Sequence, residues 1–250
     1  MSTTYRTPWL HLSPGEEGPQ LVCVPYSAKG ASQFSGWPEL LEHRTALAAV
    51  QLPAREERLT EQPIARIDEL LAGLVPALLP WIDRSFVLFG HCMGALIAAE
   101  LATALRRDHD LEPAALVLSG AIPAWQDTSR FDLSDLTDAE LIRNLRGSGA
   151  LQPRMLAEPA LLTFMLPATR ADSALCDDIR GRGRPDSPAL SCPLVLCAGR
   201  DDSRFEPKSM LGWQALTTGK ADLRIFDGDH TFLDAGPAAV AAVVREVLTA

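Results

Sequence analysis

Short apolar segments alternate along the chain with longer segments in which apolar positions recur every three or four residues. The short segments are expected to form strands at residues 21–24, 46–52, 86–89, 116–118, 193–198 and 223–226, and those at 86–89 and 116–118 are expected to be buried. The longer segments predict helices at residues 64–79, 95–105, 209–216 and 238–248. Pro76 is expected to kink or divide the first of these helices. The alternation is typical of an α/β fold, in which a mostly parallel central sheet carries helices on both faces.

Residues 125–186 do not show this alternation of strand-like and helix-like segments. They contain charged stretches of helical periodicity and no strand signal, so we interpret them as a helical lid inserted into the sheet. A chain of 250 residues supports one sizeable hydrophobic core. We therefore expect a single domain over residues 1–250, with the lid insertion at about 125–186.

The composition excludes several classes of protein. With 47% hydrophobic and 22% charged residues, the chain matches globular proteins rather than disordered or collagen-like ones. The net charge of -9 disfavours binding to nucleic acid, which needs a basic face. No apolar run is long enough to cross a bilayer, and the N-terminus lacks the apolar region of a secretory signal. We expect a cytoplasmic protein that binds neither nucleic acid nor membrane, with a monomer as the default.

Five cysteines, at positions 23, 92, 176, 192 and 197, form no CxxC pair and cannot all pair with one another. Neither a disulfide framework nor a zinc site is indicated. Cys92 is the central residue of the segment Gly90-His91-Cys92-Met93-Gly94, which joins an expected strand to an expected helix. In such a sharp turn the glycines relieve crowding and the central side chain faces a substrate, while the helix N-terminus favours a thiolate. The alternative is a small apolar cysteine buried in a tight turn.

Two further strands end in residues that could assist this cysteine. The strand at residues 193–198 is followed by Asp201 and Asp202, and the strand at residues 223–226 is followed by His230. The chain order of nucleophile, acid and histidine, each just past a strand end, is the one used by α/β-hydrolases. His230 is the candidate base. The spacing hardly separates the two aspartates, and we favour Asp202 because it lies three residues after Gly199.

These residues resemble the stand-alone type II thioesterases that accompany polyketide and nonribosomal peptide synthetases, and the resemblance extends over nearly the whole chain. It includes residues 21–34, Trp37-Pro38, 50–58, 86–100, 116–120, 199–202, Trp213 and 228–233. The resemblance implies an α/β-hydrolase fold with a helical lid. It also implies removal of acyl groups from the phosphopantetheine arm of acyl or peptidyl carrier proteins, without a metal or an organic cofactor.

The resemblance also implies roles for individual residues. It makes Cys92, Asp202 and His230 a catalytic triad, and it places the oxyanion hole at the backbone N–H groups of Met93 and Ser27. The chain departs from the family pattern after Ser27, where Ala28-Lys29 replaces the usual pair of glycines.

The larger departure is Cys92, because the family normally has a serine there. A cysteine exchanges one thioester for another, so the acyl group can be passed on reversibly. The sequence thus leaves three hypotheses open. The chain transfers or releases acyl groups through S-acyl-Cys92 to an acceptor other than water, or it is an editing thioesterase that hydrolyses aberrant acyl groups. The third, of another class, is a non-catalytic carrier-binding protein.

A carrier protein is usually acidic, so an acidic enzyme needs a local basic patch to bind it. The densest basic cluster comprises Arg180, Arg182 and Arg184, and we interpret it as a candidate contact for the pantetheine phosphate or for an acidic carrier face. A solvated glycine-rich loop is the alternative. The apolar run at residues 161–166 could line an acyl channel or simply pack within the lid.

Overall fold

The apolar segments of the chain form the strands of one sheet. The computed structural model describes residues 5–16, 18–127, 136–147 and 159–249. Its strands are β1 (Tyr5–Arg6), β2 (Leu10–Ser13), β3 (Gln20–Val24), β4 (Leu47–Val50), β5 (Phe86–His91), β6 (Ala115–Ser119), β7 (Leu194–Gly199) and β8 (Ala221–Phe226). Every residue of β3 to β7 is buried, as expected for strands covered on both faces.

The strands pair in the order β1-β2-β4-β3-β5-β6-β7-β8. The pairs from β4 to β8 are parallel, whereas β2 runs antiparallel to β4 and to β1. The α/β fold with a mostly parallel sheet is therefore confirmed. The sequence prediction missed β1 and β2, which are short, and in β2 only Leu10 is fully buried.

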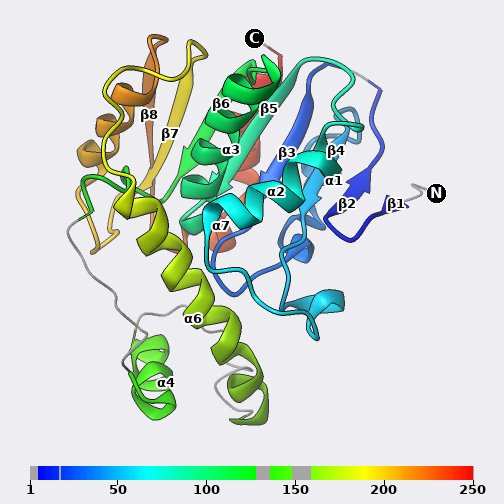
Figure 1. Cartoon of the computed structure of the whole chain (residues 1–250). Coiled ribbons are helices and arrows are strands. Elements are labelled where there is room, and N and C mark those ends of the chain that lie inside the picture. Colours follow the sequence, from blue (N-terminus) through cyan, green and yellow to red (C-terminus); the bar gives the residue numbers. More distant parts are fainter. Residues whose placement is uncertain (1–4, 17, 128–135, 148–158, 250) are drawn as a thin grey trace.

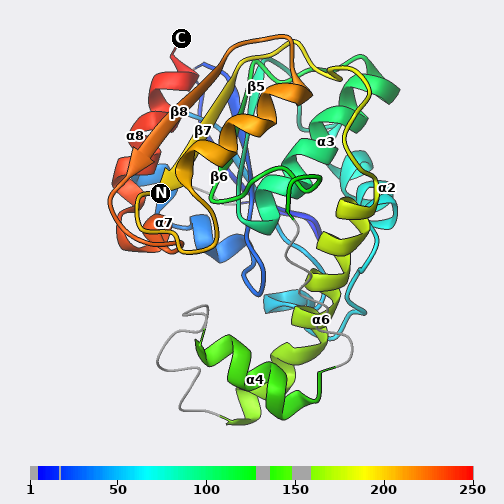
Figure 2. The ribbon, with the colours of Figure 1, turned by 90° about the vertical axis from the view of Figure 1, so that its left-hand side faces the viewer.

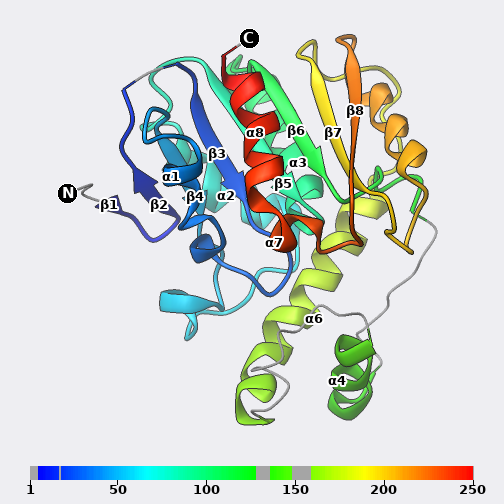
Figure 3. The same cartoon turned by 180° about the vertical axis from the view of Figure 1, so that it is seen from behind.

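Helices cover both faces of the sheet (Figures 1 and 3). The α-helices are α1 (Trp37–Leu40), α2 (Ile67–Leu78), α3 (Met93–His109), α4 (Asp138–Gly147), α6 (Pro159–Gly181), α7 (Phe232–Ala235) and α8 (Pro237–Leu248). Three 3₁₀ segments, η1 (Ala31–Phe34), η2 (Glu56–Arg58) and η3 (Pro207–Leu216), complete the described set. The side view in Figure 2 shows α8 on one side of the strands and α2 and α3 on the other.

The core has two layers, one on each face. The first contains side chains of α2, α3 and η3, and the second contains side chains of α1 and α8. The α2 helix continues through Pro76, so the expectation that this proline divides it was wrong. Six buried apolar side chains of α2 pack on the core, and this burial offsets the hydrogen bond that the proline removes.

The order of the strands places a crevice beside β5. After β3 the chain adds β4 on one side and then returns to add β5 on the other, so the order reverses between β3 and β5. Ligands of open α/β sheets bind beyond the carboxyl ends of the strands at such a switch point. The Cys92 turn follows β5 directly, and it therefore lies at this position.

Between β6 and β7 the described chain contains α4 and α6. All three overall views show α4 and the N-terminal half of α6 projecting beyond the sheet, whereas the other half of α6 packs against α2 and α3. Of the apolar run at residues 161–166, the side chains of 161–164 lie outside the described residues. Among the described helices, none is both long enough and apolar enough to cross a membrane.

Candidate active site

The turn after β5 holds Cys92 in a conformation that few side chains adopt. Cys92 has φ 54° and ψ −121°, and its N–H donates to the Ser119 carbonyl of the neighbouring strand at 2.8 Å. A Cβ at Gly90 would lie 2.1 Å from the Gly94 carbonyl oxygen, and one at Gly94 would lie 2.3 Å from the Val24 carbonyl oxygen. Both glycines are therefore required by close backbone approach, and the strained residue between them is half-exposed at the N-terminus of α3.

His230 and Asp202 meet although 28 residues separate them in the chain. The Nδ1 atom of His230 lies 2.8 Å from Oδ2 of Asp202, whose side chain is fully buried. Asp201 is exposed, and its backbone N–H donates to the Gly228 carbonyl. Of the two aspartates, the structure thus brings Asp202, which the sequence analysis favoured, to the histidine.

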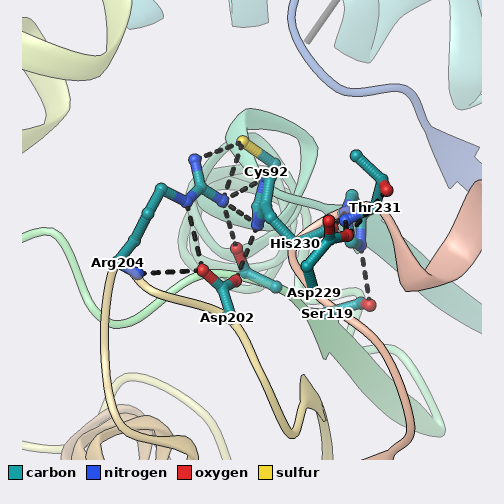
Figure 4. A network of polar contacts seen from close by, with 9 residues as sticks. Cys92, Ser119, Asp202, Arg204, Asp229, His230 and Thr231 are labelled. Carbon is teal, nitrogen blue, oxygen red and sulfur yellow. Dashed lines mark hydrogen bonds and ion pairs between the residues drawn. The ribbon is translucent and has the colours of Figure 1, made fainter. Parts of the chain in front are cut away.

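Arg204 contacts Cys92 as well as the pair of His230 and Asp202 (Figure 4). The sequence analysis did not identify this arginine. Its Nη1 and Nη2 atoms lie 3.8 Å and 3.9 Å from Cys92 Sγ, and Nη2 also contacts both ring nitrogens of His230. Within the part of the chain that the structure describes, no hydrogen bond joins Cys92 Sγ directly to His230. The guanidinium therefore lies between the candidate nucleophile and the candidate base.

The environments of the other four cysteines disfavour a thiolate. Burial raises the pKa of the Cys192 and Cys197 thiols to about 12, and it also raises the pKa of Cys23 and Cys176. These four side chains consequently remain protonated near neutral pH. All five cysteines are free thiols. Cys92 and Cys176 are both half-exposed, and Cys92 is the one in the turn after β5, with the guanidinium of Arg204 beside it.

A second histidine lies beneath the site. His91 is 2% exposed, its Nδ1 lies 2.9 Å from Ser119 Oγ, and its Nε2 lies 3.2 Å from the His230 carbonyl oxygen. Burial lowers the pKa of His91 to about 3, and the positive charge of Arg204 adds to the effect. His91 is thus a neutral, hydrogen-bonded residue that supports the His230 backbone.

The segment expected to supply one oxyanion donor is anchored by the helix α6. Asp172 of α6 accepts hydrogen bonds from Ser27 Oγ at 2.8 Å and from the Ala28 N–H at 2.9 Å. The Ala28 N–H is therefore engaged, which leaves the Ser27 N–H as the candidate donor of this loop. Met93, the other candidate, is the first residue of α3 directly after Cys92.

A buried ion pair fixes Asp172 in turn. The guanidinium of Arg55 donates to both of its carboxylate oxygens, at 2.7 Å and 3.2 Å, and both side chains are less than a tenth exposed. Asp172 therefore connects α6 both to the loop after β3 and to the segment after β4. The sequence analysis did not identify this pair, because 117 residues separate its members.

The three arginines of the candidate docking cluster differ in their ion pairs and in their exposure. Arg180 pairs with Asp127 at 2.9 Å and with Asp177, and its side chain is 18% exposed. Arg182 pairs with Asp68 and with Glu100. Arg184 is exposed. Two of the three positive charges are thus offset by carboxylates of the chain itself. Among the described residues, no group of three or more His, Cys, Asp or Glu could hold a metal ion.

Comparison with known proteins places this geometry in a family. A family model described as a thioesterase domain matches residues 19–249. The gramicidin S biosynthesis protein GrsT of Aneurinibacillus migulanus is 29% identical over 214 residues, which are 86% of this chain and 82% of GrsT.

Two solved structures are also similar to this chain. The type II thioesterase BorB from the borrelidin biosynthetic cluster has a TM-score of 0.87 and 28% identity, with 98% of this chain and all of BorB covered. The RedJ thioesterase from the prodiginine pathway of Streptomyces coelicolor has a TM-score of 0.83 and 33% identity, covering 94% of this chain and 95% of its own. The chain therefore belongs to the thioesterase family, in which it groups with the type II thioesterases.

Proposed function

We propose that this thioesterase takes acyl groups from the phosphopantetheine arm of a carrier protein in polyketide or nonribosomal peptide biosynthesis. The acyl group is held as S-acyl-Cys92 and passed to an acceptor other than water. The observation that carries the proposal is Cys92 itself, because a thiol stands in the strained turn where the family uses a serine, 3.8 Å from the guanidinium of Arg204. The described helix α4 and the N-terminal half of α6, which project beyond the sheet, are proposed to form the lid.

The proposed chemistry follows from the use of a thiol, that of Cys92, as the nucleophile. Attack of Cys92 Sγ on the carrier thioester forms a new thioester and releases the carrier thiol, so the bond formed and the bond broken are of the same kind. Loading is therefore near thermoneutral and reversible. His230, oriented by Asp202, is proposed to exchange protons with the incoming and leaving groups. Catalysis by a Cys-His-Asp triad of this kind requires neither a metal nor an organic cofactor.

The oxyanion formed during attack is proposed to bind the N–H groups of Met93 and Ser27. The close contact of Gly94 with the Val24 carbonyl holds the loop after β3 against the turn, and Asp172 fixes that loop through Ser27 Oγ. Donors held in place in this way stabilise developing charge without having to reorganise. Loss of one donor typically lowers the rate by about 10²–10³.

The partner is proposed to be an acyl or peptidyl carrier protein bound by a protein that is monomeric and cytoplasmic. Of the candidate docking cluster, Arg184 has the exposure that contact with a carrier requires, whereas Arg180 and Arg182 would have to exchange their present carboxylate partners.

Mass spectrometry of the intact protein tests the proposed function. The enzyme is mixed with an acyl-loaded carrier, an unloaded second carrier and several amines, and Cys92→Ala and Cys92→Ser variants are treated in parallel. We expect an acyl adduct on Cys92 that moves to the second carrier or to an amine, and no such adduct on the alanine variant. Free acid as the main product would instead assign an editing thioesterase. No adduct and no turnover would favour a non-catalytic carrier-binding protein.

A further inference from the structure

The side chain of Arg204 reaches the sulfur of Cys92, and the structure fixes it there. Its backbone N–H donates to Asp202 Oδ1 at 3.1 Å, and its Nε lies 3.5 Å from the same oxygen. Asp202 is thus shared, with Oδ1 facing Arg204 and Oδ2 facing His230. Beyond this anchor, the two Nη atoms of Arg204 extend to Cys92 Sγ, and Nη2 lies 3.4 Å from the Gly120 carbonyl oxygen (Figure 4).

A guanidinium beside a thiol has a defined chemical consequence. It is positively charged at every pH of interest, it donates hydrogen bonds and it cannot accept a proton. Both Nη atoms approach the same sulfur, so the site offers two donors to a negatively charged sulfur. Resting on the proposed function above, we propose that Arg204 is a catalytic residue that pairs with thiolates at this site and thereby selects a thiol, rather than water, as the acyl acceptor.

The selection follows from the acidity of the two acceptors. An ordinary thiol ionises with a pKa of about 8.5, whereas the pKa of bulk water is about 15.7. A thiol can therefore arrive as a thiolate that a cation stabilises, but water must give up its proton to a base during the attack. The ring of His230, which would accept that proton, has its Nδ1 on Asp202 Oδ2 and is in contact with the guanidinium of Arg204, whose positive charge repels a second positive charge on the ring. This arrangement favours a thiolate and hinders the activation of water.

The resulting acyl transfer takes place in two steps, in each of which bonds and protons balance. In the first, the Cys92 thiolate attacks the carrier thioester, the new S–C bond forms, and the carrier sulfur leaves as a thiolate that takes a proton from His230. In the second, an acceptor thiol returns a proton to His230, and its thiolate attacks S-acyl-Cys92. The Cys92–acyl bond then breaks, and the Cys92 thiolate is restored beside Arg204. Across the two steps, the acyl group moves from the carrier thiol to the acceptor thiol and one proton moves the other way. The transfer needs no oxidant or reductant.

The charge pairing is tested by alkylation, independently of any acyl substrate. Iodoacetate is an anion and iodoacetamide is neutral, and their reaction with Cys92 is followed on the tryptic peptide of residues 85–106, which contains no other cysteine. We expect Arg204→Gln to lower the ratio of the iodoacetate rate to the iodoacetamide rate about fivefold, since a unit charge about 4 Å away is removed. Arg204→Lys should keep most of the ratio.

Arg200→Gln is the matched control, because Arg200 lies in the same loop and pairs with the exposed Asp227, away from Cys92. This variant changes the net charge by the same amount and should leave the ratio unchanged. Equal ratios in the wild-type protein and in Arg204→Gln would show that the guanidinium does not pair with the thiolate, and would overturn the proposal.

The acceptor selection is tested on S-acyl-Cys92, which is formed from an acyl-loaded carrier and then given N-acetylcysteamine or buffer alone. We expect the wild-type protein to pass the acyl group to the thiol and Arg204→Gln to release a larger fraction as free acid. An unchanged partition would overturn the selection. Failure to form S-acyl-Cys92 with any carrier would overturn the proposed function and the selection together, while the alkylation ratio would still decide the charge pairing.

Discussion

Gly94 is the residue on which the geometry of the nucleophile turn depends most directly. A Cβ there would meet the Val24 and Pro25 carbonyl oxygens at 2.3 Å and 2.7 Å, and these are backbone atoms that cannot rotate away. The same contact sets the distance between Cys92 and the loop that carries Ser27. A change at Gly94 therefore affects both the nucleophile and the candidate oxyanion hole.

We expect Gly94→Ala to lower the free energy of unfolding by about 1–3 kcal/mol. Because a displacement of about 1 Å can cost about 10²-fold in rate, we also expect acyl loading of Cys92 to slow by that order. Gly36→Ala is the control, since a Cβ at Gly36 has nothing within 4 Å. Urea unfolding and the rate of adduct formation measure both effects. A Gly94→Ala variant that behaves like Gly36→Ala would contradict the assigned role of this contact.

The buried His91 leads us to a prediction about how the free energy of unfolding depends on pH. Its pKa is about 3 in the folded protein, below the value of about 6.5 for an exposed histidine, so between these values the unfolded chain binds a proton that the folded chain does not. Stability consequently decreases as the pH falls through this window. Between about pH 7.5 and about pH 5, His91 should contribute a loss of about 2 kcal/mol in the free energy of unfolding.

The measurement compares urea unfolding of the wild-type protein and of His91→Gln at both pH values. The variant has no titrating group at this position, so its stability should fall by about 2 kcal/mol less than that of the wild type. Parallel losses in the two proteins would show that His91 takes up a proton in the folded state.

At the scale of elements, the helix α6 is fixed by one buried ion pair. Asp172 on α6 and Arg55 after β4 are both less than a tenth exposed, and Asp172 also accepts bonds from the loop after β3. The position of α6 and the position of the loop after β3, which carries the candidate oxyanion donor Ser27, are thus coupled through a single carboxylate.

We expect Asp172→Ala to lower the free energy of unfolding by about 3–5 kcal/mol, because it leaves the Arg55 charge buried without its partner. The double variant Arg55→Met, Asp172→Leu should recover much of this stability but not the activity, since the loop loses its anchor. Asp138→Ala is the control, because the Asp138 side chain is 66% exposed and its ion pair with Arg170 should contribute about 0–1 kcal/mol. Similar losses for Asp172→Ala and Asp138→Ala would argue against a structural role for the buried pair.

At the scale of the whole molecule, net charge should govern the proposed encounter with a carrier protein. The chain has a net charge of -9, and the structure pairs Arg180 and Arg182 with carboxylates of its own. An acidic carrier therefore meets a surface that on balance repels it. Screening by salt should weaken this repulsion.

We expect kcat/KM for an acyl-loaded carrier to rise several-fold between about 50 mM and about 300 mM NaCl, where the screening length shortens markedly. The same measurement with a small neutral acyl thioester should show little change. A rate that falls with salt would show that a basic surface dominates docking, and Arg184→Glu would then reveal whether Arg184 belongs to it.

The sequence by itself determined the features that depend on local patterns. Continuous apolar runs predicted the buried parallel strands, and the glycine-flanked Cys92 after one of them predicted the turn, because both signals lie within a few neighbouring residues. The weak β1 and β2 and the uninterrupted α2 were not predicted correctly, since pairing and packing with distant segments decided them.

Only the tertiary structure decided which distant side chains meet. It brought Asp202, the aspartate favoured from the sequence, against His230, it placed Arg204 on Cys92 across 112 residues, and it buried Asp172 against Arg55. The physical reason is the same in each case. Spacing along the chain does not specify direction in space, whereas a buried charge must find a partner wherever the fold brings one within reach.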